Sequence, residues 1–257
     1  MRLGMIGQGA IARIALETLR KCQTAKADEV IILTREGASD LKLQDCSTRS
    51  VDRLEALIDA RPQLVCEAAG HEAVRAYGVA VLNAGIDFII TSIGALADDD
   101  LHERLKASAA STGARLLLAT GAIGGLDILA AAKLSGLTSV TYTARKPPSA
   151  WGLVNQSCAE AVALYDGPAR GAVTAFPKNA NVAAAIALAG IGFEATRVRL
   201  LADPGIARNI HEIQIASAAA DVRIEIAGHA APDNPKTSLT TGFSLARAIL
   251  DHHERPS

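Results

Sequence analysis

Short apolar runs alternate with amphipathic segments through the first half of the chain. Six strands are expected, and all but the third are almost continuously apolar, which is typical of strands buried on both faces of a parallel sheet. They span residues 3–6, 29–33, 48–51, 64–68, 87–91 and 115–119, and the third is the weakest. Helical patterns separate most of them, including one that begins at Asp98, whose side chain suits a helix N-cap. This alternation predicts an α/β fold with a doubly wound parallel sheet.

The pattern changes after Gly125. Residues 126–134 and 181–189 predict helices of small apolar residues, and four runs alternate apolar with polar positions. These runs are residues 139–143, 197–200, 210–215 and 222–226. Period-two alternation indicates a sheet with one face in water, as antiparallel sheets often have. We therefore predict an α+β domain with an open, mostly antiparallel sheet covered by helices on one face, then a turn at residues 234–238 and a closing helix at residues 241–250.

The first strand leads into a glycine-rich turn and then directly into a helix. The turn reads Gly7-x-Gly9-x-x-Ala12. Gly7 allows the tight turn, Gly9 lets a pyrophosphate approach the backbone, and Ala12 lets the helix pack close to the strand. The phosphates would then lie on unpaired N–H groups at the helix N-terminus. We predict a Rossmann nucleotide-binding domain whose contacts are Gly7, Gly9, Ala10, Ile11 and Ala12, with a purely structural turn as the alternative.

Other cofactor contacts are expected beyond the carboxyl ends of the strands, where such sheets bind ligands. The loop after the fourth strand adds Ala69 and Gly70. At the end of the second strand an acidic residue would hold the 2′-hydroxyl of NAD, but the chain has Thr34 and Arg35 there. Arg35 fits the 2′-phosphate of NADP. The sequence therefore favours NADP, with NAD as the alternative. Arg35 could equally be a solvated loop residue without a role in binding.

These patterns divide the chain into three parts. Residues 1–121 are predicted to form the NAD(P)-binding domain and residues 122–238 the α+β substrate and catalytic domain. Residues 239–257 are predicted to form a C-terminal helix that packs back on the first domain.

One histidine of the second half lies in an alternating run. His211 shares its strand face with Ile213 and Ile215, so we expect it to point toward the covered face of the sheet. A buried imidazole that titrates near neutrality suits proton transfer, and a structural histidine is the alternative. Surface or turn positions are expected for His102, His229, His252 and His253, and either a helix start or a place near the nicotinamide for His71.

Three groups of basic residues lie beside prolines at predicted turns of the second half. They are Arg145-Lys146, Lys178 with Asn179, and Lys236. Basic side chains at a domain edge suit a small anionic substrate held between two domains. Lys178, Asn179 and Lys236 are therefore weak candidates for substrate binding, and ordinary surface residues are the alternative.

Composition narrows the class of protein. Among 257 residues, 26 Lys and Arg face 27 Asp and Glu, so no basic field indicates nucleic acid or an anionic membrane. Four scattered cysteines without a Cys-x-x-Cys pair argue against a metal site or a disulfide framework and favour a reducing compartment. No signal peptide is expected, because residue 2 already begins a strand, and no segment is apolar enough to span a bilayer. We expect a cytoplasmic protein without a metal.

Nine motifs follow one another along nearly the whole chain. They are residues 7–11, 67–71, 92–96, 121–127, 145–147, 176–182, 202–204, 209–211 and 234–238, among them Gly7-Gln8-Gly9 and Asn209-Ile210-His211. Together they resemble the L-aspartate dehydrogenase family. Two departures are Ala12, where the family usually has glycine, and Thr120, where serine is common. Both are conservative changes that leave the reaction of the family intact.

The resemblance implies NAD(P)-dependent oxidation of L-aspartate to oxaloacetate and ammonia through iminoaspartate, with a further use in NAD biosynthesis. It implies that His211 is the active-site histidine and that Ala122 and Asn181 are cofactor contacts. A homodimer is expected because two-fold assemblies are the commonest oligomers. The alternatives are another two-domain dehydrogenase, such as homoserine dehydrogenase or dihydrodipicolinate reductase, and a non-catalytic NAD(P)-binding sensor.

Overall fold

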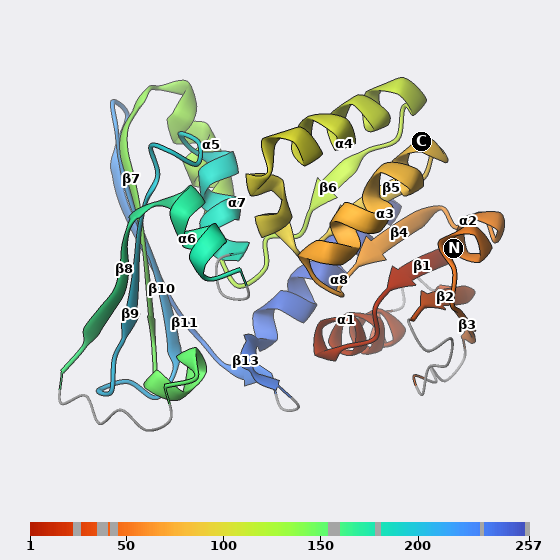
Figure 1. Ribbon diagram of the computed structural model, residues 1–257, viewed down its shortest axis with the longest axis horizontal. Helices are drawn as coiled ribbons and strands as arrows, with labels where there is room; N and C mark the ends of the chain where they lie inside the picture. The colour runs from red at the N-terminus through yellow and green to blue at the C-terminus, as the bar shows by residue number, and fades with distance from the viewer. Residues whose placement is uncertain are drawn as a thin grey trace. The chain divides into compact units, whose positions relative to one another are not determined.

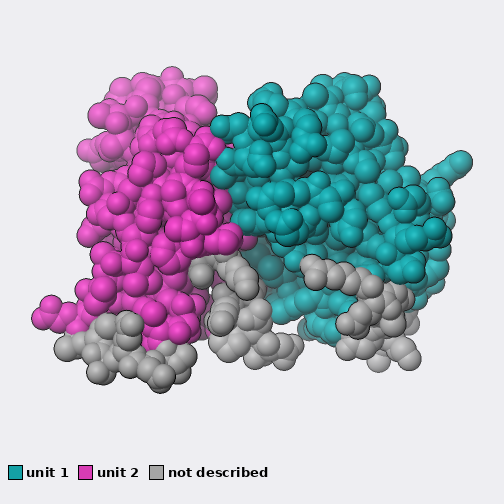
Figure 2. Space-filling view, viewed as in Figure 1, with its two compact units in different colours: residues 1–119, 241–257 teal, residues 120–240 magenta. Residues whose placement is uncertain are grey.

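The computed structural model describes residues 1–22, 27–34, 41, 46–153, 160–177, 181–231 and 234–254, with the backbone alone for residues 234–237. The chain forms two compact units, which Figure 2 shows in different colours. The first consists of residues 1–119 and 241–257, and the second of residues 120–240. The chain therefore leaves the first unit once and returns to it with its last segment.

Six parallel strands form the sheet of the first unit (Figure 1). They are β1 (Arg2–Ile6), β2 (Glu29–Leu33), β3 (Ser47–Val51), β4 (Leu64–Glu67), β5 (Asp87–Ile90) and β6 (Leu116–Leu118). Their order across the sheet is β3-β2-β1-β4-β5-β6, and every neighbouring pair is parallel. This order reverses direction at β1 and is that of the Rossmann fold, which confirms the fold predicted from the apolar runs.

Side chains alternate between the two faces of this sheet, and each face is covered by helices. One face carries Leu3 and Met5 of β1, which form a buried cluster with α1 (Ala10–Lys21) and with α8 (Leu239–Glu254). The other face is covered by α2 (Leu54–Asp59), α3 (His71–Asn83) and α4 (Asp99–Thr112), and the 3₁₀ helix η1 (Ile93–Ala97) packs beside α3 and α4. Burial on both faces explains why β1, β2, β4 and β5 are almost continuously apolar.

Local signals set the ends of several helices in this unit. The Asp98 carboxylate accepts a hydrogen bond from the Leu101 backbone N–H at 3.1 Å, so it caps α4 as its sequence position predicted. The α4 helix then ends at Gly113, which has a φ of 77°. In α8, Leu245, Ala246, Ile249 and Leu250 recur at helical spacing and belong to the buried cluster of the sheet.

The second unit contains a five-stranded sheet in the order β11-β10-β7-β9-β8. The strands are β7 (Leu137–Lys146), β8 (Val162–Pro168), β9 (Arg197–Ala202), β10 (Asn209–Ser217) and β11 (Asp221–Gly228). Three of the four strand pairs are antiparallel, and β7 pairs with β9 in parallel. The prediction of an open, mostly antiparallel sheet is confirmed.

Helices cover one face of this sheet (Figure 1). They are α5 (Leu126–Leu134), α6 (Ala169–Ala175) and α7 (Asn181–Ala189), and the 3₁₀ helix η2 (Pro148–Trp151) follows β7. The side chains of α7 from Val182 to Ala187 are all buried. Small residues allow α7 to lie close to its neighbours, which explains a helix that is apolar on every side.

The sequence missed or misjudged several elements of the second unit. The sequence patterns predicted neither β8 nor α6. The strand β8 is an exposed edge strand with an irregular register between Ala163 and Tyr165. The turn predicted at residues 234–238 is wrong, because this segment is the strand β13 (Asn234–Ser238), paired with β12 (Ala230–Ala231). A proline is tolerated there because a two-stranded ribbon leaves one side of the strand unpaired.

Candidate active site

The glycine-rich turn closes tightly at the end of β1. Gly7 has a φ of 98°, and its N–H donates to the carbonyl oxygen of Leu33 at 3.0 Å. A Cβ at this position would lie 2.8 Å from the carbonyl oxygen of Ala68, so both the conformation and the space require glycine. At Gly9, the N-cap of α1, a Cβ would meet nothing within 4 Å. Gly7 is thus needed by the protein itself, and the space beside Gly9 is left open.

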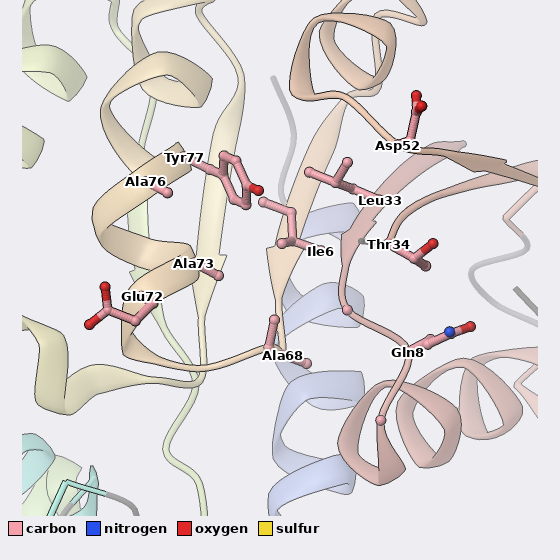
Figure 3. Close-up of a pocket in the computed structure, with 13 residues that line it drawn as sticks. Ile6, Gln8, Leu33, Thr34, Asp52, Ala68, Glu72, Ala73, Ala76 and Tyr77 are labelled. Atoms are coloured by element: carbon pink, nitrogen blue, oxygen red, sulfur yellow. The ribbon is translucent and has the colours of Figure 1, made fainter. Parts of the chain in front are cut away.

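A cavity of about 460 Å³ opens beyond the carboxyl ends of β1, β2 and β4 (Figure 3). Its lining residues are Ile6, Gly7, Gln8, Gly9, Leu33, Thr34, Asp52, Ala68, Ala69, Glu72, Ala73, Ala76 and Tyr77. The volume is in the range of cofactor sites. The side-chain oxygen of Gln8 is buried and accepts no hydrogen bond from the described residues.

The cavity also meets the N-terminus of α1, which no described side chain caps and whose first turn has no acidic residue. Backbone N–H groups at such a terminus attract anions. An open approach at Gly9 and an uncapped helix N-terminus together fit a dinucleotide with its pyrophosphate at the turn.

Three of the predicted cofactor contacts, Gly7, Gly9 and Ala69, line this cavity, whereas Ala10, Ile11, Ala12 and Gly70 are not among its lining residues. Ala12 is fully buried in the cluster between α1 and the sheet, so its small side chain serves packing.

A buried carboxylate that the sequence did not single out holds the loops beside this cavity. Glu67 is fully buried at the end of β4. Its Oε1 accepts hydrogen bonds from the N–H groups of Ala69 at 2.7 Å and Gly70 at 2.6 Å, and from the Ser92 hydroxyl at 2.9 Å. Its Oε2 accepts from the N–H groups of Thr91 at 3.3 Å and Ser92 at 3.1 Å. Glu67 therefore fixes the loops that follow two neighbouring strands.

Some predicted residues fall outside the described part of the chain. Arg35, Lys178 and Asn179 lie outside the described residues, and so does the side chain of Lys236. Thr34, which the sequence grouped with Arg35, is buried and lines the cavity. These positions keep the roles that the sequence assigned to them as proposals only.

In the second unit, His211 lies on the covered face of the sheet. Its side chain is 3% exposed, and its Nδ1 lies 2.7 Å from the phenol oxygen of the fully buried Tyr142 on β7. The two rings are almost parallel, with an angle of 7° between their planes. Burial, and then the positive charge of nearby Lys146, lower the pKa of His211 to about 3. The imidazole is therefore neutral at physiological pH.

Lys146 is the last residue of the strand β7 and lies directly before η2, so it lies beside a turn as expected for Arg145-Lys146. Its side chain is buried and its ammonium stands 4.9 Å from the centre of the Trp151 ring, a cation–π contact. Burial lowers the pKa of Lys146 to about 8. Arg145 forms an ion pair with Asp203 at 2.7 Å. Pro147 is the N-cap of η2 and Pro148 its first residue, so the two prolines mark the end of the strand.

The two remaining predicted cofactor contacts both belong to the second unit. Ala122 is buried in the turn before α5, and Asn181 is the first residue of α7. Neither observation tests the assignment of a cofactor to these residues.

The other histidines have ordinary positions with one exception. His71 begins α3 and is half-buried, and His229 is exposed. His252 is not a surface residue, because its Nε2 lies 2.8 Å from Oδ2 of Asp87 and its side chain is 13% exposed. This contact joins α8 to β5. It was not expected because His252 lies near the end of the chain.

Metal ligands, thiols and membrane-spanning helices are the other features to consider among the described residues. The described part of the chain has no group of three or more His, Cys, Asp or Glu side chains able to hold a metal ion. Cys22, Cys46 and Cys66 are free thiols, and Cys158 lies outside the described residues. No helix among the described segments is long and apolar enough to cross a membrane.

Comparison with known families covers both units. Residues 4–119 match the model of the NAD binding domain of homoserine dehydrogenase, and residues 127–252 match that of the C-terminal part of aspartate dehydrogenase. A protein of Pseudomonas aeruginosa named L-aspartate dehydrogenase is 39% identical, with 98% of this chain and 97% of that protein aligned. The chain belongs to the L-aspartate dehydrogenase family.

Two further members extend this relationship. A Ralstonia nicotianae protein named L-aspartate dehydrogenase is 42% identical, over 97% of this chain and 96% of its own. The crystal structure of aspartate dehydrogenase from Thermotoga maritima has a TM-score of 0.81 and 28% identity, and covers 100% of this chain and 98% of that one. Membership of the L-aspartate dehydrogenase family, which the sequence motifs indicated, is confirmed across both units.

Proposed function

We propose that this protein oxidises L-aspartate to oxaloacetate and ammonia, through iminoaspartate, with NAD or NADP as the oxidant. The observation that carries this proposal is the full-length similarity, at 39% and 42% identity, to proteins named L-aspartate dehydrogenase. The cavity at the glycine-rich turn supports it independently, because it opens beside Gly9 at the uncapped N-terminus of α1, where a pyrophosphate would bind. The protein is an NAD(P)-dependent oxidoreductase that acts on the amino group of a dicarboxylic amino acid.

The nucleotide is held by the first unit. Gly9 gives the pyrophosphate room at the N-terminus of α1, and Gly7 forms the tight turn before it. Glu67 keeps the backbone of residues 69–70 and 91–92 in place beside the cavity. When bound, the nicotinamide accepts the hydride that leaves Cα of aspartate. Arg35 supports a preference for NADP, and Ala122 and Asn181 are further assigned contacts.

His211 is the group that we assign to acid–base chemistry. Two roles are open to it: it could activate the water that attacks the imine, or it could carry the proton of the departing amine. Its neutral state leaves one ring nitrogen with a lone pair, which either role needs, but its pKa of about 3 makes it a weaker base than the near-neutral imidazole expected from the sequence. Lys178, Asn179 and Lys236 are assigned to the two carboxylates of the substrate, an assignment that rests on their residue types and positions in the sequence.

Three finer features belong to the proposal. We propose that the enzyme is a homodimer, that it works in the cytoplasm and that released iminoaspartate feeds NAD biosynthesis. Light scattering of the purified protein measures the mass of the assembly, and fractionation of its host measures its location. Loss of pyridine nucleotides on deletion of the gene, restored by the wild-type gene, would support the biosynthetic role.

A spectrophotometric assay tests the proposed reaction. Purified protein is incubated with L-aspartate and each of NAD and NADP at alkaline pH, and the reverse reaction with oxaloacetate, ammonia and the reduced cofactor. Reduced cofactor should appear with L-aspartate and not with homoserine. Turnover of homoserine alone would favour the other dehydrogenase class, and tight cofactor binding without turnover of any amino acid would favour a sensor.

A further inference from the structure

The contact between Tyr142 and His211 is built into the sheet of the second unit. Tyr142 on β7 pairs across the sheet with Ile213 of β10, so His211 is its diagonal neighbour two residues away. The phenol is fully buried and the imidazole is 3% exposed. The two side chains are therefore held by two regular strands, and the distance of 2.7 Å between Oη and Nδ1 is that of a strong hydrogen bond.

The hydrogen-bonding needs of the phenol decide which group donates. Burial raises the pKa of Tyr142 far above its ordinary range, so the phenol keeps its proton. Among the described residues, His211 is the hydrogen-bond partner of the phenol. If Nδ1 carried the imidazole proton, the phenol proton would be buried without an acceptor. If the phenol donates to Nδ1, both groups are satisfied.

A neutral imidazole has one proton, so a lone pair used at Nδ1 places that proton on Nε2. We propose that Tyr142 fixes His211 as the Nε2–H tautomer, so that the neutral imidazole meets the substrate as a hydrogen-bond donor and not as a proton acceptor. This proposal rests on the proposed function for the identity of the substrate. It assigns Tyr142 as a positioning residue that acts through His211.

The charge beside the imidazole supports the same state. The ammonium of Lys146 disfavours a second positive charge, so His211 stays neutral where Lys146 is protonated. A neutral Nε2–H suits an oxygen atom that gains negative charge, such as a carboxylate oxygen or the carbonyl oxygen of oxaloacetate. Of the two roles open to His211, the fixed tautomer disfavours removal of a proton from water, since Nε2 has no free lone pair.

Nitrogen NMR of the histidine rings tests the tautomer directly. The protein is labelled with ¹⁵N-histidine, and the ring signals of His211 are assigned by their loss in His211→Ala. At neutral pH without substrate, Nε2 of His211 should give the signal of a protonated nitrogen and Nδ1 that of an unprotonated acceptor. A protonated Nδ1 in the wild type overturns the proposal, and this result does not require any variant to fold.

Tyr142→Phe supplies the second measurement, with Tyr165→Phe as its matched control. Tyr165 belongs to the same sheet, and its phenol donates to the carbonyl oxygen of Pro168 at 2.7 Å, away from the histidine. Loss of the Tyr142 phenol should mix the two tautomers of His211 and lower kcat about tenfold, the effect of one ordinary hydrogen bond, with the KM for cofactor unchanged. Tyr165→Phe should leave the His211 signals and kcat as they are.

The outcomes separate this proposal from the proposed function. An unchanged His211 spectrum in Tyr142→Phe overturns the role of Tyr142 even if L-aspartate is oxidised normally. A protein that shows the Nε2–H tautomer but turns over no L-aspartate contradicts the proposed function and leaves the tautomer as measured.

Discussion

The hydroxyl of Ser92 donates a hydrogen bond of 2.9 Å to the carboxylate of Glu67, and this contact ties the end of β5 to the end of β4. The same carboxylate accepts from the backbone of Ala69 and Gly70 in the next loop. One buried negative charge therefore shapes two loops at the edge of the sheet where dinucleotides bind. The positive partial charges of these N–H groups compensate for its burial.

Glu67→Gln should weaken cofactor binding and lower stability. The amide has the size of the carboxylate, but it has no charge and would turn an NH₂ group toward N–H donors. We expect a loss of about 3 kcal/mol in the free energy of unfolding and a cofactor KM at least about tenfold higher. Asp98→Ala removes another carboxylate that caps backbone N–H groups in the same unit. This control should cost about 1 kcal/mol of stability and leave cofactor affinity unchanged, so equal effects of both variants on KM would contradict the role of Glu67.

Gly9→Ala should impair cofactor binding with little effect on the fold. A Cβ at residue 9 meets nothing within 4 Å, so it projects into space that a ligand would use. We expect unfolding to change by less than about 1 kcal/mol, while the cofactor KM rises severalfold. Gly7→Ala is the contrasting variant, because its Cβ collides with the Ala68 carbonyl and its φ is positive. Thermal unfolding with and without cofactor distinguishes the two, and a destabilised Gly9→Ala protein would show that this glycine serves the fold.

His211→Ala should remove most of the turnover without releasing the cofactor. A group that handles protons or polarises the substrate contributes about 10²–10⁴-fold to the rate. We expect a fall of that size in kcat and an unchanged dissociation constant for NAD or NADP, measured by fluorescence titration. His229→Ala replaces an exposed histidine of the same unit and should have no effect. Wild-type turnover of His211→Ala would end the assignment of this residue.

Lys146→Met should remove a pH-dependent part of the stability. Burial lowers the pKa of Lys146 from 10.5 to about 8, so between these values the unfolded chain binds a proton that the folded chain does not. The contribution of Lys146 to stability therefore rises with pH through this window, by roughly 3 kcal/mol.

The measurement for Lys146 is a difference between two proteins. Burial raises the pKa of the Cys66 thiol, which makes stability fall with pH over part of the same window. Both proteins share Cys66, so its effect cancels when urea unfolding of the wild type and of Lys146→Met is compared at about pH 7.5 and about pH 10. The wild type should gain relative to the variant at the higher pH. A difference that is independent of pH would mean that the lysine is solvated.

Leu245→Ala should destabilise the first unit even though it lies near the chain end. Leu245 is fully buried in the cluster that α8 forms with the sheet. Its truncation leaves a cavity and should cost about 2–5 kcal/mol of unfolding free energy. Leu134→Ala is a suitable control, because Leu134 is 91% exposed at the end of α5, and it should change stability by less than about 0.5 kcal/mol. Similar losses from both variants would argue against the packing of α8.

Patterns local in sequence made much of this fold predictable. Apolar runs predicted five of the six parallel strands, β3 being expected only as a short, weak strand. Alternation placed His211 on the same covered face as Ile213 and Ile215. The side chain of Asp98 predicted the start of α4, which it caps. Each of these signals depends on spacing or residue type within a few positions, which a sequence displays directly.

Relationships between distant positions were not predictable in the same way. The hydrogen-bond partner of His211 is Tyr142, which lies 69 residues away in the sequence. Glu67 accepts a hydrogen bond from Ser92, which lies in the loop after a different strand. The exposed strand β8 lacks the apolar run that marks a buried strand. Tertiary packing decides these three features, and no local pattern reports it.

The first unit is assembled from both ends of the chain, and this has a consequence for its synthesis. The second unit is one unbroken stretch, so all of its residues are synthesised before α8 has been completed. The face of the first sheet that receives Leu245 and Ile249 stays uncovered until α8 has been synthesised. The first unit therefore completes its fold only after the second unit has been synthesised, although domains usually fold in the order of their synthesis. A nascent chain that stalls before α8 exposes an apolar face of the first sheet to chaperones and proteases.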